Sequence, residues 1–290
     1  MNPQFPIYII SKGRADSRLT SKALESMGVP YRIVVEPQEF DEYAAVIDPS
    51  KILKLDMSYK EKYETCDNRG DDAPAGAGAV RNFVWDHSIS EGHKWHWVMD
   101  DNINGFYRLN HNLKVPVGSG GCFVAMENFC LRYSNVAMAG PNYHMFASRK
   151  TLMPPFILNT RIYSCNLIRN DMLFRWRGRL NEDTDLSLRM LKASWCTILF
   201  NAFLQYKVTT QLVKGGNTAE FYENEGTFLK SQWLVDMHPD IARVAWRFNR
   251  IHHHVNYTQF KKNKLIRRDD SKQDTGVNNF GMGLHKVEKK

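Results

Sequence analysis

Apolar residues in the first hundred positions form short runs, and a helical pattern separates the first two runs. Residues 6–14 (PIYIISKGR) and 31–37 (YRIVVEP) predict buried strands, and residues 20–27 predict a helix between them. Further along, the pattern predicts a strand, a helix and a strand at 51–56, 80–92 and 95–100. Such alternation favours a parallel sheet covered by helices, so we expect an α/β fold.

The pattern is less regular in the second half of the chain. Helices are expected at 122–134, 181–194 and 228–260, and strands at 136–140, 143–147, 161–170 and 196–209. Polar or Gly-rich segments predict loops at 67–79, 112–121 and 214–221. We therefore expect a mainly helical region to follow the last strand.

Composition limits the class of protein. The chain has 290 residues, of which 43% are hydrophobic and 24% charged, as in ordinary globular proteins. No apolar run reaches the roughly 18 residues that suggest a membrane span, and the N-terminus has no signal-peptide pattern. Five cysteines without a CxxC pair predict reduced thiols and a cytoplasmic location, which would be the host cytoplasm for a phage protein.

The positive charge is concentrated near the C-terminus. The net charge is +8, and residues 261–290 carry nine Lys or Arg against four Asp or Glu. This segment therefore holds +5 of the total, and the remaining 260 residues hold +3. A basic tail suits a polyanionic partner, and it suits a solubilising chain end equally well.

Two carboxylates and an amide end the strand in WHWVMDDNING (95–105). Asp100, Asp101 and Asn102 offer the oxygen ligands that Mg²⁺ or Mn²⁺ prefers. One acid could hold a ribose hydroxyl while its neighbour holds the metal. The alternative is a turn or a helix cap, since Asp and Asn favour both.

A second acidic motif, NEDTDLSLR (181–189), opens a predicted helix. Glu182 or Asp183 could act as a general base that deprotonates a hydroxyl nucleophile, and a helix N-terminus favours its ionised form. The alternative is purely structural, because acids in this position also stabilise a helix end.

Three further groups of residues could contact ligands. Arginines and aromatics alternate around residues 169–179 and could clamp phosphates and stack on bases, or form a solvated face: Arg169, Phe174, Arg175, Trp176, Arg177 and Arg179. The loop Ser11-Lys12-Gly13-Arg14 could meet a nucleotide, although neither a Walker A nor a GxGxxG pattern is present. His252, in a run of three histidines expected on a helix, could complete an octahedral metal site or simply support solubility.

The opening stretch PIYIISKGRADSRLTSKALESMGVPYRIVVEPQEFDEY is similar to the phage-type TET-associated glycosyltransferases. GAVRN (78–82) and the strand end WVMDDN (97–102) match that family as well, and the resemblance covers roughly residues 5 to 205. It implies a GT-A type, Rossmann-like mixed sheet, mostly parallel and flanked by helices. It also implies a nucleotide-sugar half at about 1–105, an acceptor half at about 106–225, and a helical basic extension over 226–290.

The resemblance further implies transfer of a sugar from a nucleotide diphosphate sugar, UDP-linked, to 5-hydroxymethylcytosine in phage DNA. Mn²⁺ or Mg²⁺ would assist, and attack in line would invert the anomeric centre. The implied donor-binding residues are Ser11, Lys12, Arg14, Glu36, Arg81, Asn82 and Asp100. Many GT-A enzymes carry a carboxylate where Asn102 stands, so Asp101 is the expected principal metal ligand. Asp183, or else Glu182, is the expected base.

Other classes fit parts of the same pattern. The acceptor could be a polysaccharide or a protein. The chain could be a nucleic-acid-binding module whose acids are structural, or a nucleotidyltransferase, which also uses paired acids and a metal.

Overall fold

The computed structural model describes residues 1–67, 76–208, 223–247 and 250–270. Its centre is a ten-stranded sheet in the order β3-β2-β1-β4-β9-β7-β10-β5-β6, with β8 paired to β10. The strands are β1 (Ile7–Ile10), β2 (Arg32–Val35), β3 (Ile52–Lys54), β4 (Trp95–Asp100), β5 (Ile103–Asn110), β6 (Leu113–Pro116), β7 (Val136–Tyr143), β8 (Phe156–Leu158), β9 (Cys165–Arg169) and β10 (Cys196–Lys207).

Most strands of the sheet run in one direction. Strands β3, β2, β1 and β4 pair in parallel, and so do β7 and β10. Strand β9 lies between β4 and β7 and is antiparallel to both, so β4, β7 and β10 share one direction. Their carboxyl ends therefore lie at the same edge of the sheet.

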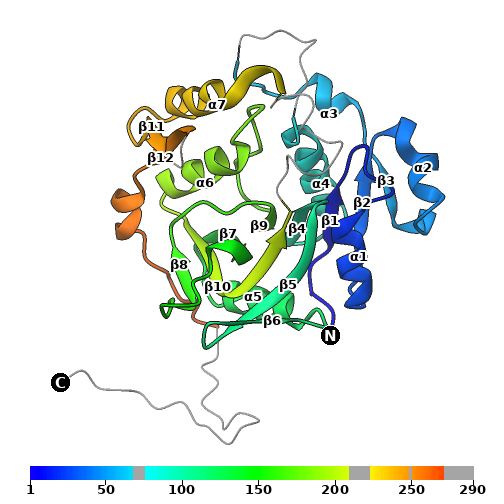
Figure 1. Ribbon diagram of the computed structural model, residues 1–290, viewed down its shortest axis with the longest axis horizontal. Helices are drawn as coiled ribbons and strands as arrows, with labels where there is room; N and C mark the ends of the chain where they lie inside the picture. The colour runs from blue at the N-terminus through cyan, green and yellow to red at the C-terminus, as the bar shows by residue number, and fades with distance from the viewer. Residues whose placement is uncertain (68–75, 209–222, 248–249, 271–290) are drawn as a thin grey trace, which may run out of the picture.

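Helices cover both faces of the sheet and form a three-layer α/β fold. They are α1 (Leu19–Ser26), α2 (Phe40–Ala44), α3 (Ser58–Glu61), α4 (Gly78–Ser90), α5 (Gly121–Leu131), α6 (Glu182–Lys192) and α7 (Glu223–Met237). Leu24 of α1 and Phe123 of α5 belong to the core on one face, and Trp85 of α4 and Leu186 of α6 to the core on the other. In Figure 1, α4 and α6 lie above the strands and α1 and α5 below them. The predicted mixed α/β fold of the GT-A type is confirmed.

The C-terminal region is only partly helical, which corrects the prediction of a helix over 228–260. Helix α7 ends at Met237, and β11 (Ala242–Arg247) and β12 (Arg250–Val255) form an antiparallel hairpin. Pro239 disfavours helical backbone at the residue before it, so the helix stops there. Leu188 and Leu191 of α6 share a core with Leu234 and with residues 241, 242 and 260. Figure 1 shows α7 and the hairpin above α6.

The segment 112–121, predicted as a loop, contains strand β6. Strands β5 and β6 form a hairpin whose two turn residues, His111 and Asn112, have positive φ angles of 46° and 65°. Strand β6 is largely exposed, so it lacks the apolar alternation by which a strand is recognised. The predicted loops at 67–79 and 214–221 lie largely or wholly outside the described residues. No described helix is long and apolar enough to cross a bilayer.

Candidate active site

The ends of strands that run in one direction bring several predicted donor residues to one edge of the sheet. Ser11 follows β1, Glu36 follows β2, and Asp100 is the last residue of β4. Lys207, the last residue of β10, lies at the same edge. Open α/β sheets bind their ligands at this edge.

Arg81, in the first turn of α4, joins three carboxylates beneath this edge. Its Nη1 donates to Glu182 Oε1 at 3.0 Å and to Asp183 Oδ1 at 2.5 Å. Its Nη2 donates to Asp100 Oδ1 at 2.8 Å. The side chain is buried and its guanidinium lies 4.6 Å from the centre of the Trp176 ring. One cation thus connects the two acidic motifs that were predicted separately.

The start of α4 is shaped for this contact. A Cβ at Gly78 would lie 1.7 Å from the hydroxyl of Tyr63, so only glycine lets the first turn pack this closely. The Tyr63 hydroxyl itself donates to the backbone oxygen of Gly178 at 2.8 Å. The helix start is therefore held against the loop before α6, and Arg81 is directed at the acids that open α6.

Lys207 adds a second cation beside the three carboxylates. Its Nζ donates to Asp100 Oδ2 at 2.5 Å and to Ser164 Oγ at 2.8 Å. The Ser164 hydroxyl is also hydrogen-bonded to the Tyr143 hydroxyl at 2.7 Å. The Arg81 cluster, as we call it, comprises Arg81, Asp100, Glu182, Asp183 and Lys207.

Asp101 is directed away from the Arg81 cluster toward the loop after β1. It forms a salt bridge with Arg14 and accepts a hydrogen bond from Ser11 Oγ at 2.8 Å. Ser11 Oγ is also 2.6 Å from the Tyr43 hydroxyl. These groups are buried, so Ser11, Arg14 and Asp101 together fix the shape of the loop after β1.

Glu36 lies beside two lysines at the end of β2. It forms a salt bridge with Lys60, its Oε1 is 3.6 Å from Lys12 Nζ, and its Oε2 accepts from Gln38 at 2.6 Å. The Lys12 side chain is 42% exposed, so its ammonium can reach a ligand at the strand edge.

Burial and neighbouring charges shift the pKa values of the carboxylates in the Arg81 cluster in opposite directions. Burial alone would raise the pKa of Asp100, but Lys207 and Arg81 outweigh it and hold that pKa well below its usual range. Burial raises the pKa of Glu182 to about 7, and it also raises the pKa of Asp183 despite the nearby Arg81. Asp100 therefore stays ionised, while the Glu182–Asp183 pair can exchange protons near neutral pH.

The residues present do not fit a divalent metal ion. Asp100 is neutralised by Lys207 and Arg81, and Asp101 by Arg14. Asn102 contributes one buried oxygen without a hydrogen-bond partner, which is a neutral ligand. Within the described part of the chain, no three His, Cys, Asp or Glu side chains gather as a metal would require. A dication bound to Asp100 or Asp101 would compete with Arg81, Lys207 or Arg14 for the same carboxylate oxygens.

His252 is not on a helix, as the sequence analysis expected, but on strand β12. Its Nδ1 is 2.7 Å from the backbone oxygen of His253, to which it donates. The residue opposite it in the hairpin is Ala245. No described feature brings His252 into a group with Asp101 or Asn102 that could hold a metal ion.

The basic segment around residues 175–179 folds inward, and this corrects its predicted role in nucleic-acid binding. Trp176 is 1% exposed and lies under Arg81, so it cannot stack on a base. Arg175, Arg177 and Arg179 form salt bridges with acids of the chain itself, which are Asp86, Asp185 with Glu64, and Asp67. Their charges are compensated within the fold.

Asn82 holds this segment in place. Its Nδ2 donates to the backbone oxygen of Trp176 at 2.9 Å, and its Oδ1 accepts from the backbone N–H of the same residue at 2.9 Å. Both polar atoms of the Asn82 side chain are used, so Asn82 positions Trp176 beneath Arg81.

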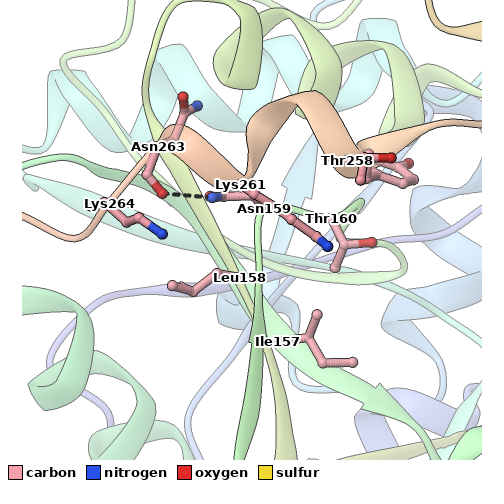
Figure 2. Close-up of a pocket in the computed structure, with 9 residues that line it drawn as sticks. Ile157, Leu158, Asn159, Thr160, Thr258, Lys261, Asn263 and Lys264 are labelled. Carbon is pink, nitrogen blue, oxygen red and sulfur yellow. Dashed lines mark hydrogen bonds between the residues drawn. The ribbon is translucent and has the colours of Figure 1, made fainter.

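A cavity of about 490 Å³ lies elsewhere, between β8 and the short helix η6 (Tyr257–Lys262). Figure 2 shows its lining, in which Asn159 donates to the backbone oxygen of Asn263 at 2.8 Å. None of its lining residues belongs to the Arg81 cluster. The cavity is therefore separate from the site at the strand edge.

Replacing Arg81 by Met should lower the free energy of unfolding by about 3–5 kcal/mol, because three buried carboxylates lose their shared cation. Chemical denaturation measures this. The control is Arg32→Met, which removes a half-exposed salt bridge to Glu91 and should cost below about 1 kcal/mol. Equal losses in the two variants would show that Arg81 does not hold the carboxylates together.

Comparison with known families identifies the chain. A family model described as TET-associated glycosyltransferase matches residues 5–216. The chain belongs to this family. A search of the curated proteins found no match. The matched range of this TET-associated glycosyltransferase includes the whole Arg81 cluster, and the alternatives of a nucleotidyltransferase and of a non-catalytic binding module are set aside.

Three polar residues of this glycosyltransferase site were missed in the sequence. Lys207, Ser164 and Tyr143 come from β10, from the loop before β9, and from the end of β7. One signal could have found Lys207: it ends the long apolar run CTILFNAFLQYK, as Asp100 ends WHWVMD. A charged residue that ends a buried strand is costly to bury without a partner.

Proposed function

We propose that this glycosyltransferase moves a sugar from a UDP-linked donor to the hydroxymethyl group of 5-hydroxymethylcytosine in DNA, in the cytoplasm and with inversion. The observation that carries the proposal is the contact of Arg81 with Asp100, Asp183 and Glu182. Arg81 thereby brings Asp100, the proposed donor-binding carboxylate, close to the carboxylate that we propose as the base.

Asp183 is the proposed base. It interacts electrostatically with Asp100 and Lys207, whereas Glu182 lies toward Lys230 and Tyr63. The acceptor hydroxyl gives its proton to Asp183, and its oxygen bonds to the anomeric carbon. The bond from that carbon to the diphosphate oxygen breaks, and the nucleoside diphosphate leaves with the electron pair. A single displacement of this kind inverts the anomeric centre.

Positive charge from the chain itself stabilises the leaving diphosphate. The Lys207 ammonium lies at the strand edge beside Asp100, and that of Lys12 lies beside Glu36. Preorganised cations at the point where negative charge develops lower the barrier to transfer. Asp100 is ionised and accepts a donor hydroxyl, while Ser11, Arg14 and Asp101 keep the donor loop in shape.

A direct assay tests the acceptor. We expect DNA that contains hydroxymethylcytosine to gain the mass of a sugar when it is incubated with the protein and a panel of nucleotide sugars. Matched DNA with unmodified cytosine lacks the hydroxyl and should stay unchanged. If folded protein yields no product with any donor, the proposed acceptor is wrong, and polysaccharide and protein acceptors become the next candidates.

Metal dependence, implied by the family resemblance, stays a prediction that the internal cations argue against. If Lys207 and Lys12 carry the charge stabilisation, extensive dialysis against EDTA should leave the transfer rate nearly unchanged. A resident metal that stabilised the leaving group would contribute several kcal/mol, so its removal would slow transfer by roughly a hundredfold or more. A loss of that size, restored by Mn²⁺, would contradict the assignment.

A further inference from the structure

The stretch of chain over residues 103–170 is almost free of acidic residues. From Ile103 to Asn170 the sequence contains seven Lys or Arg and a single acid, Glu127. Glu127 is fully buried, and its carboxylate accepts hydrogen bonds from the N-terminal backbone and from Trp97. At the surface, the charged residues of this stretch are therefore Lys and Arg, of which Arg169 forms a salt bridge with Asp171.

Aromatic rings gather on this surface immediately beside the Arg81 cluster. Tyr107 of β5, His144 of the short helix η3 (His144–Phe146) and Tyr206 of β10 are in mutual contact. The ring centroid of His144 is 4.7 Å from that of Tyr107 and 5.1 Å from that of Tyr206. Phe146, in the same short helix as His144, is 51% exposed, while Tyr206 is 41% exposed. We call these four residues the aromatic platform.

Cations flank the aromatic platform. Lys114 Nζ donates to the backbone oxygen of His144 at 2.6 Å. Burial, Lys114 and Arg149 each lower the pKa of His144, so that ring is neutral at pH 7 while positive charge surrounds it. Arg149, three residues after Phe146, is exposed.

The platform is continuous with the proposed site of transfer. Tyr206 precedes Lys207, and Phe146 packs on Tyr143 with ring centroids 5.5 Å apart. The Tyr143 hydroxyl is bonded to Ser164, which also accepts from Lys207. A polymer bound on the platform would therefore lie next to the Arg81 cluster, because Tyr143 and Ser164 connect the two.

We propose that the aromatic platform binds unstacked nucleic acid, with bases on its rings and phosphates on Lys114 and Arg149. Exposed aromatics set among cations are the combination that binds single strands, because every base has a face to stack and every phosphate a charge to pair. The cations favour this polyanion over a neutral polysaccharide. The proposal refines the proposed function, since a base outside the stack can present its hydroxymethyl group to Asp183.

Binding in the absence of donor tests the platform separately from catalysis. A fluorescently labelled single-stranded oligonucleotide is titrated with the wild type and with Tyr206→Ala and Phe146→Ala, and anisotropy is recorded. We expect each variant to bind roughly tenfold more weakly, in keeping with the value of one stacked base. The control is Trp246→Ala, which removes a 69% exposed aromatic from β11 and should bind like the wild type.

The outcomes separate the two proposals. If both platform variants bind like the wild type, or if Trp246→Ala weakens binding equally, the platform assignment is wrong. It is also wrong if the protein binds a neutral polysaccharide but no oligonucleotide. If binding falls as expected but hydroxymethylcytosine DNA receives no sugar, the platform stands and the proposed acceptor group fails. A raised KM for DNA with an unchanged KM for the nucleotide sugar would support both.

Discussion

Asp183→Asn is expected to slow glycosyl transfer by about a hundredfold to ten-thousandfold, which is the usual contribution of a general base. The amide keeps the shape of the carboxylate and can still face Arg81, but it cannot accept the acceptor proton. Single-turnover rates with saturating donor and DNA measure the effect. Binding of the nucleotide sugar should change little, since Asp100 and Lys207 remain.

Glu182→Gln is the matched control for Asp183→Asn. Glu182 shares Arg81 with Asp183 but interacts with Tyr63 and Lys230 rather than with Asp100. Its substitution should therefore cost much less activity. A loss as large as that of Asp183→Asn, or a wild-type rate for Asp183→Asn, would reassign the base.

The dependence of the transfer rate on pH tests the roles of Glu182 and Asp183 independently. Burial raises the pKa of Asp183 and raises that of Glu182 to about 7, so protonation removes the base on the acidic side. Activity should therefore fall as the pH is lowered and Asp183 is protonated, at a higher pH than for an ordinary aspartate. In Glu182→Gln only Asp183 of this pair titrates, so an acidic limb that persists in this variant belongs to Asp183.

Lys207→Met is expected to lower kcat by about a hundredfold to a thousandfold, the range seen when one preorganised stabilising group is removed. The ammonium lies at the strand edge beside Asp100, where the leaving diphosphate is proposed to lie. Lys207→Arg keeps the charge and should recover part of the rate. Steady-state kinetics with varied nucleotide sugar measures kcat and KM separately.

A control variant and a stability measurement accompany the Lys207 prediction. Lys192→Met removes a partly exposed ammonium paired with Asp240, at the opposite end of α6 from Glu182 and Asp183, and should leave kcat unchanged. Thermal unfolding of Lys207→Met shows whether the fold persists, since Asp100 keeps Arg81 as a partner. A folded Lys207→Met variant with wild-type kcat would remove Lys207 from the mechanism.

Local sequence patterns were sufficient to predict several strands and the two acidic motifs of this protein. Strands within 6–14 and 31–37 and over 95–100 were predicted because their residues are apolar and β-branched, and β1, β2 and β4 lie there, largely buried in the sheet. The two acidic motifs were found because each stands at the end of an element, where α/β proteins place polar residues. Periodicity and chain position carry this information, and neither requires knowledge of distant contacts.

Only the tertiary structure decided which charges are available to a ligand. The arginines at 175–179 look free in the sequence, yet the fold pairs them with Asp86, Asp185, Glu64 and Asp67. Arg81 meets Asp100 and Asp183 because the start of α4 packs between a strand end and a helix start. The aromatic platform likewise combines residues from β5, η3 and β10. Electrostatic and ring contacts depend on the distance between side chains in space. The order of strands in the sheet sets that distance, and separation along the sequence does not.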